Sequence, residues 1–344
     1  MWEVPRSAGL GGNRMRYRRS AVAAVAFVIV VASPALTTAS ASVRGGYTWA
    51  EQTVFALGPT GNYVAEWMGT PQKWTVIGGP ASHVYAGSAG VFATDPNTGD
   101  IFEYNGTPGS WTAIGGPGVQ FVEGGGHLYG LGPNFAYVAE WNGTPGNWTI
   151  IGGAATGLYA GPYGLFATGP SMSSEDIWHY NGTPNSWADI GTPGDSIYSD
   201  SAIAVGSSAV YRIDTADSAG NTVVDEWSGG TTWTPILTVG SSDELSGLIA
   251  GNDGVYIADT TTNGERYLEY GGTPNTWSPI TPLVPSSSAT GMFPIAESAT
   301  NLYGGTFELT RPEDFINDIE VYSGTGTTWT VIGGPADPGL GAGD

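Results

Sequence analysis

The chain has 344 residues, with 55 glycines, 23 prolines and no cysteine, so disulfide scaffolds, thiolate catalysis and cysteine-bound zinc or iron–sulfur sites are excluded. The formal net charge is −21, and only five of the ten Lys and Arg residues lie beyond residue 41. Five scattered cations cannot form the basic surface that nucleic acid or anionic lipid requires. Because 12% of the residues are aromatic, we expect a folded chain in which Gly and Pro mark tight turns.

The first 41 residues have the pattern of an export signal. A basic stretch at 14–19 precedes an apolar run from Ala21 to Ala32, and Ala39-Ser40-Ala41 offers small residues for cleavage. This apolar run is shorter than the roughly 20 residues that span a bilayer. We therefore predict a signal peptide over 1–41, no membrane insertion, and a secreted, extracellular protein of bacterial origin that spans 42–344.

One phrase recurs along the rest of the chain: aromatic, x, Gly, Thr, Pro, x, x, Trp, Thr, x, Ile, Gly, Gly. It first runs from Trp67 to Gly79, and looser copies start at Trp227, Tyr270 and Tyr322. The second tryptophan of the phrase falls at Trp74, Trp111, Trp148, Trp187, Trp233, Trp277 and Trp329. Seven copies at a spacing of roughly 40–50 residues are typical of four-stranded propeller blades.

Each copy resolves into four short strands. In the second copy we predict strands at His83–Gly87, Gly90–Thr94, Asp100–Asn105 and Trp111–Ile114, joined by turns rich in Gly, Pro, Asn and Ser. No part of 42–344 shows a helical period of useful length. The sequence therefore predicts an all-β, single-domain, seven-bladed β-propeller of four-stranded blades over 42–344.

Most of the aromatic residues fall into columns that occur once in every copy. A residue that every blade carries is most simply explained as packing between neighbouring blades. Trp49 and Trp178 are the tryptophans of 42–344 that stand outside these columns. Trp178 is therefore a candidate aromatic platform for a ligand.

Two resemblances follow from these motifs. The span from Tyr104 to Trp111, Tyr-Asn-Gly-Thr-Pro-Gly-Ser-Trp, resembles the hairpin between the third and fourth strands of a kelch repeat. The phrase Trp-Thr-Ala-Ile-Gly at 111–115 is similar to tectonin and tachylectin-like lectin propellers. The second resemblance implies several equivalent sugar sites around one ring.

An acidic residue precedes the third-strand aromatic residue in most copies. The members of this column are Glu66, Glu103, Glu140, Glu226 and Glu269, with His179 in the equivalent place of the fourth copy. Neighbouring side chains of a strand alternate faces, so this acid points away from the packed aromatic residue. It can accept hydrogen bonds from sugar hydroxyls, or it can be a polar residue that bonds the next blade.

The loop Asn-Gly-Thr-Pro gives a second repeated polar feature, at Asn105, Asn142 and Asn181. Its amides are candidate sugar ligands. The alternative is turn chemistry, because Asn-Gly favours positive φ. The same triplets also match the N-glycosylation sequon.

A cation site is a third possibility. The stretch Asp95-Pro-Asn97-Thr-Gly-Asp100 has the oxygen spacing of a calcium loop, but Gly106 stands where the bidentate acid belongs. A hairpin turn explains the same residues. Calcium is the one cofactor that the sequence leaves open.

The sequence contains no nucleophile elbow, phosphate-binding loop or sialidase box, and we predict no catalytic residue. The favoured function is a secreted, multivalent, lectin-like propeller that binds glycans. The first alternative is a kelch-like scaffold for a cell-surface or extracellular protein, which would use the irregular insertions of the later blades. These insertions lie at Gly194–Asp200, Asp217–Asn221 and Thr310–Asn317. A glycoside hydrolase is the second alternative.

Overall fold

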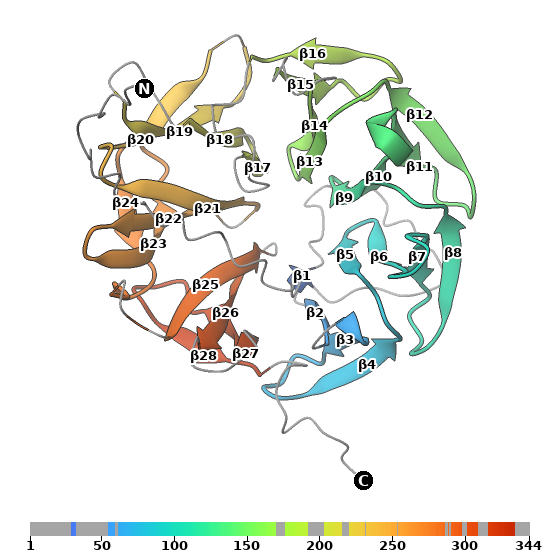
Figure 1. Cartoon of the computed structure of the whole chain (residues 1–344), viewed down its shortest axis with the longest axis horizontal. Helices are drawn as coiled ribbons and strands as arrows, with labels where there is room; N and C mark the ends of the chain where they lie inside the picture. The colour runs from blue at the N-terminus through green and yellow to red at the C-terminus, as the bar shows by residue number, and fades with distance from the viewer. Residues whose placement is uncertain are drawn as a thin grey trace, which may run out of the picture.

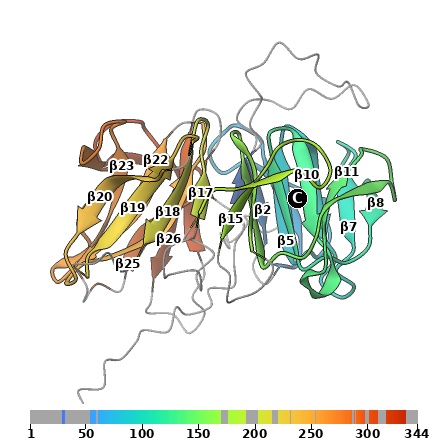
Figure 2. The same ribbon diagram turned by 90° about the horizontal axis from the view of Figure 1, so that it is seen from above.

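The computed structural model has seven four-stranded antiparallel sheets arranged around one axis, which confirms the predicted seven-bladed propeller (Figure 1). It describes residues 29–31, 54–58, 61–169, 176–191, 203–214, 220–230, 232–252, 254–285, 288, 290–297, 301–308 and 316–333. In each blade the strands pair in chain order, from the innermost strand by the axis to the outermost strand at the rim. Seen from the side, the turns of the blades form two faces (Figure 2).

The strands follow the predicted rhythm closely. They are β1 (Ile29–Val31), β2 (Val54–Leu57), β3 (Val64–Trp67) and β4 (Trp74–Gly78) in blade one; β5 (His83–Gly87), β6 (Gly90–Thr94), β7 (Ile101–Tyr104) and β8 (Trp111–Gly115) in blade two; β9 (Gln120–Gly124), β10 (His127–Leu131), β11 (Val138–Trp141) and β12 (Trp148–Gly152) in blade three; β13 (Gly157–Gly161), β14 (Gly164–Thr168), β15 (Ile177–Tyr180) and β16 (Trp187–Asp189) in blade four; β17 (Ile203–Val205), β18 (Val210–Asp214), β19 (Thr222–Trp227) and β20 (Thr234–Val239) in blade five; β21 (Glu244–Ala250), β22 (Val255–Thr261), β23 (Gly264–Tyr270) and β24 (Trp277–Pro279) in blade six; and β25 (Thr290–Glu297), β26 (Leu302–Glu308), β27 (Ile316–Tyr322) and β28 (Trp329–Val331) in blade seven. The four strands predicted for the second copy are confirmed to within one residue at each end. A 3₁₀ turn, η2 (Pro133–Phe135), lies between β10 and β11 of blade three.

The core is divided among the blade interfaces. The buried apolar side chains form seven clusters, one for each pair of neighbouring blades. One of them joins Val54 and Ala56 of blade one to Tyr303 and Ile332 of blade seven, so the ring is closed by apolar contact. The aromatic columns are therefore packing residues, as their repetition predicts.

The repeated phrase itself forms a staple between blades. The indole N–H of each fourth-strand tryptophan donates a hydrogen bond to the carbonyl of the isoleucine in the preceding blade. The pairs are Trp74–Ile332 (3.4 Å), Trp111–Ile77 (2.9 Å), Trp148–Ile114 (2.8 Å), Trp187–Ile151 (2.8 Å), Trp233–Ile190 (2.6 Å), Trp277–Ile236 (3.0 Å) and Trp329–Ile280 (2.7 Å). The glycine after the isoleucine leaves room for the indole, because a Cβ at Gly115 would lie 2.8 Å from Trp148 Nε1. Trp, Ile and Gly of the phrase are thus explained by architecture.

Blade one differs from the expectation at its inner strand. β1 lies inside the predicted signal peptide and pairs with β2, with Ile29 opposite Ala56 and Val31 opposite Val54. Its β-branched residues suit a strand. The sequence predicts that the repeats start at Tyr47, and this residue lies outside the described residues. The predicted insertion Gly194–Asp200 and most of the two later insertions also lie outside them.

Candidate functional site

The acidic column lies between blades, half-buried. Burial raises the pKa of Glu66 and of Glu226. Burial, together with the charge of Glu140 in the preceding blade, raises the pKa of Tyr180. Glu140 also accepts a hydrogen bond from His127 Nδ1 of its own blade at 2.6 Å. The remaining members, Glu103 and Glu269, are likewise half-buried on β7 and β23. The geometry favours contacts between blades for this column over a row of open sugar sites.

His179 is surrounded by aromatic rings. Its ring stacks on Phe166 at 4.6 Å between centroids and meets Trp227 edge-on at 5.6 Å. Burial lowers its pKa, which favours the neutral imidazole. Trp178, the neighbouring residue on β15, is half-buried, and its indole N–H has no hydrogen-bond partner within the described residues. His179 thus packs among aromatic rings, and the Trp178 indole nitrogen is enclosed.

The loop asparagines are exposed, but their amides are used within their own hairpins. Asn105 Nδ2 donates to Ser110 Oγ and Thr112 Oγ1, both at 3.0 Å, and Thr112 donates back to Asn105 Oδ1. Asn142 makes the same set of bonds in blade three, and Asn181 Nδ2 bonds Ser186 Oγ. These side chains hold the turn between the third and fourth strands.

The possible calcium loop is a turn whose first acid is already engaged. Asp95 Oδ1 accepts hydrogen bonds from the backbone N–H groups of Asn97 (2.8 Å) and Thr98 (2.9 Å), which lower the pKa of the carboxyl. This is the geometry of an Asx turn. Among the described residues, no group of three or more His, Asp or Glu side chains is placed to hold a metal ion.

Blade three contains a pocket that none of the repeated motifs predicts. It lies between the β8–β9 connection and the β10–β11 loop and has a volume of about 320 Å³. The aromatic rings of Phe121, Tyr137 and Trp148 line it. Its other walls are formed by the backbone and short side chains of Gly115–Gly118, Gly130–Pro133 and Ala139. It is therefore an apolar, aromatic pocket on one face of the ring.

Glycine lets the rings of this pocket lie against the backbone. A Cβ at Gly130 would lie 2.9 Å from Phe121 Cε1, and a Cβ at Gly132 would lie 2.5 Å from Tyr137 Cζ. Gly130 faces Phe121 across the β9–β10 pair. The equivalent pairs are Val84 with Ala93 in blade two and Leu158 with Ala167 in blade four. Blade three therefore has an aromatic residue opposite a glycine, where blades two and four have two aliphatic residues.

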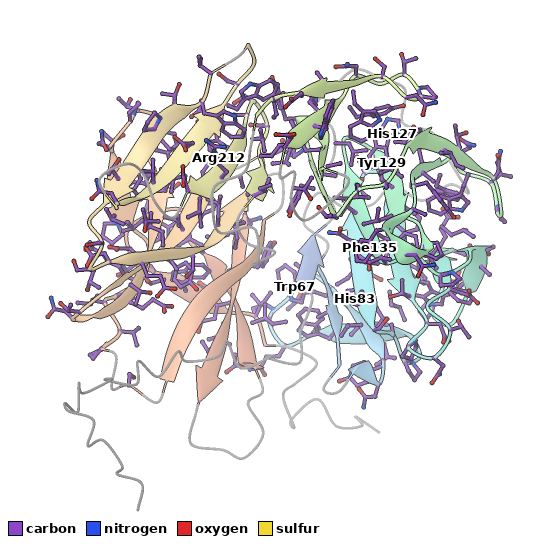
Figure 3. All side chains as sticks on the ribbon, turned by 45° about the horizontal axis from the view of Figure 1, so that its top comes forward. Trp67, His83, His127, Tyr129, Phe135 and Arg212 are labelled. Atoms are coloured by element: carbon purple, nitrogen blue, oxygen red, sulfur yellow. The ribbon has the colours of Figure 1, made fainter. Side chains whose placement is uncertain are left out.

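The loop beside the pocket contains strained backbone. Asn134 and Phe135 adopt φ values of 59° and 60°, a conformation that bulky L-residues rarely take. The Phe135 side chain is 43% exposed and lies past the end of β10 that is opposite His127 (Figure 3). In blade one the equivalent residue is Gly61, for which φ of 65° is unstrained. Strain of this kind is found at functional sites.

Comparison with known proteins gives the fold and no family. No protein-family model matches the chain, and no curated protein matches it. The propeller domain of the Trilobed protease from Pyrococcus furiosus is 8% identical, with a TM-score of 0.57 over 90% of this chain and 100% of that one. A catalytically inactive virginiamycin B lyase from Staphylococcus aureus, with quinupristin, is 11% identical, with a TM-score of 0.52 over 83% and 93%. An uncharacterised protein from Listeria monocytogenes is 11% identical, with a TM-score of 0.52 over 82% and 91%.

In the part of the chain that the structure describes, no helix is long and apolar enough to cross a membrane.

The pocket could have been found by aligning the copies and reading their differences. Such an alignment places Phe135 opposite Gly61 and Gly130 opposite Ala56. The residues that every copy shares form the staple and contain no sign of this pocket.

Proposed function

We propose that this protein is an exported, non-catalytic recognition propeller that binds an extended peptide segment of an extracellular partner at the blade-three pocket. The observation that carries the proposal is Phe135, an exposed aromatic residue held at positive φ beside an aromatic pocket. An exposed aromatic ring and a residue at positive φ both cost the fold free energy, and such costs are found where a ligand uses the residue. Aromatic-lined grooves on rigid scaffolds are a common way to bind extended peptides.

A glycan-binding function is the second candidate, because the three rings of the pocket would also suit the apolar faces of a sugar. A multivalent lectin, however, needs equivalent sites. Gly130 is replaced by Ala56, Ala93 and Ala167 in blades one, two and four, so this pocket is not repeated there. Blades five and six carry Arg212 and Ile257 at this position, and blade seven repeats the glycine as Gly304. The chain therefore does not offer the row of equivalent sites that a multivalent lectin needs.

The test is to pan a random-peptide library on the purified protein, with a glycan array run in parallel. Gly130→Ala places a methyl group against Phe121, and we expect it to weaken the selected peptides by about tenfold or more. Gly153→Ala is the matched control, because a Cβ there meets nothing within 4 Å.

Phe135→Gly separates binding from stability. It should weaken the same peptides while raising the free energy of unfolding by about 1 kcal/mol, since the positive φ is no longer strained. Sugars retained on the array, with peptides that ignore both pocket variants, would instead favour the lectin.

A further inference from the structure

We infer that the blade-three pocket takes a cationic side chain, the Arg or Lys of the partner's extended segment, with Asp100 as its counter-charge. This inference rests on the proposed function and names the chemistry of its ligand. The apolar rings accept the aliphatic stem of such a side chain, and the carboxylate at the edge accepts its head group.

Asp100 lies next to the pocket wall. A Cβ at Gly116, one of the lining residues, would be 3.9 Å from Asp100 Oδ1, and a Cβ at Gly99 would be 3.2 Å from Pro117 Cβ. The Asp95–Asp100 turn of blade two therefore packs directly against the wall of the blade-three pocket. Within the described residues, the Asp100 carboxylate oxygens accept no hydrogen bond, although the Asp100 backbone N–H donates to Thr98 Oγ1. The half-buried carboxylate is thus available to a ligand.

The surrounding charge favours a cation. From Trp74 to Gly152, a stretch that includes all of blades two and three, the sequence contains no Lys or Arg and five Asp or Glu residues, so it carries a formal charge of −5. No basic side chain of this stretch can neutralise Asp100, and the excess of acids attracts cations to this part of the ring.

The aromatic residues add to this preference. Long basic side chains lay their methylene groups along apolar surface while the charged end stays polar. Phe121, Tyr137 and Trp148 offer that surface. A neutral apolar side chain would fill the pocket without using the carboxylate.

The experiment compares each selected peptide with a form in which citrulline replaces Arg, or norleucine replaces Lys, by fluorescence polarisation. We expect the neutral form to bind about tenfold more weakly. Asp100→Asn should weaken the cationic peptide by a similar factor and leave the neutral peptide unchanged, which is the signature of a direct pair in a double-mutant cycle. Glu244→Gln, an exposed acid on β21 of blade six, removes the same charge away from the pocket and should change neither.

The outcomes separate the two proposals. Some selected peptides could lose affinity in Gly130→Ala yet contain no Lys or Arg, or bind Asp100→Asn as tightly as the wild type. That result would overturn the cationic ligand and leave the binding function in place. Peptides that ignore Gly130→Ala and Phe135→Gly, or a library that yields none, would overturn both.

Discussion

Blades one and three share backbone hydrogen bonds in the loop after the second strand but differ in its three central residues, of which Phe135 in place of Gly61 is the largest change. In blade one Gly58 N–H bonds the Tyr63 carbonyl at 2.8 Å, and in blade three Gly132 N–H bonds the Tyr137 carbonyl at the same distance. Ala81 N–H donates to Gly61, and Ala155 N–H donates to Phe135, in equivalent places. The repeat therefore determines the backbone of this loop even where the residue does not suit it. Function is better sought where a blade departs from the repeat than in the residues that all blades share.

The largest effect that we predict also distinguishes blade three from its neighbours. Glu123 occupies the inner-strand position of Ala86 and Ala160, and its carboxylate accepts a hydrogen bond from Ala89 N–H at 3.0 Å. Burial raises its pKa from 4.5 to about 7. An acid whose folded pKa is raised stabilises the fold only while protonated. The free energy of unfolding should therefore fall, by on the order of 3 kcal/mol, as the pH rises from about 4.5 to 7.

Urea denaturation at pH 5 and pH 8 measures this difference. Glu123→Gln should remove most of it, because the amide does not titrate, while Glu244→Gln should leave it intact. A Glu123→Gln variant with the same pH dependence as the wild type would show that the carboxylate is not the titrating group.

A second prediction transfers the aromatic residue of blade three to blade one. In Gly61→Phe, the new side chain must accept φ of 65° and a Cβ 2.7 Å from the Ala81 carbonyl oxygen. We expect a loss of about 2 kcal/mol in the free energy of unfolding. Gly69→Ala is the control for backbone strain alone, since φ is 72° there and a Cβ meets nothing within 4 Å. Equal losses in both variants would mean that the contact with Ala81 is easily relieved.

The fold was predictable because the staple uses the same residues in each blade. The staple joins Trp111 of the second copy to Ile77 of the first copy, next to Gly78. The spacing of the phrase predicted seven blades, and the turn residues predicted the four strands of the second copy. The blade-three pocket was not predictable in the same way. The pocket requires a glycine, Gly130, opposite the Phe121 ring in one strand pair. It also requires the positive φ of Phe135, which follows from hydrogen bonds that the loops of blades one and three share. The acidic column could be located from the sequence, but its burial depends on the neighbouring blade.

A third prediction compares the ring closure with an ordinary blade interface. The Trp148 staple onto Ile114 is 2.8 Å long, whereas the Trp74 staple onto Ile332, between blades one and seven, is 3.4 Å long. Trp148→Phe should lower the free energy of unfolding by about 1 kcal/mol more than Trp74→Phe, because the shorter hydrogen bond contributes more. Thermal denaturation of the two variants decides this. Equal losses would mean that the closure is as tightly bonded as the other interfaces.

The smallest effect concerns the inner strand of blade one. β1 belongs to the predicted signal peptide, so a processed chain that begins at Ser42 cannot use it. The repeat aligns 46–50 with His83–Gly87, the inner strand of blade two, and this segment lies outside the described residues. This segment offers five residues, close to β2 in the sequence, in place of the three-residue β1. We therefore expect the 42–344 chain to melt within about 2 °C of the full-length chain.

Thr48→Pro tests whether 46–50 forms the inner strand of blade one. Proline has no backbone N–H, so it removes a hydrogen bond from a strand that must pair with β2. It should destabilise the 42–344 chain clearly and the full-length chain less, since only the latter still contains β1. If the 42–344 chain is much less stable than the full-length chain, then β1 is part of the working propeller and export cannot remove it. If the two chains are equally stable, the signal segment occupies blade one only until it is cleaved. If the 42–344 chain is much less stable, residues 29–31 are a permanent strand of the propeller.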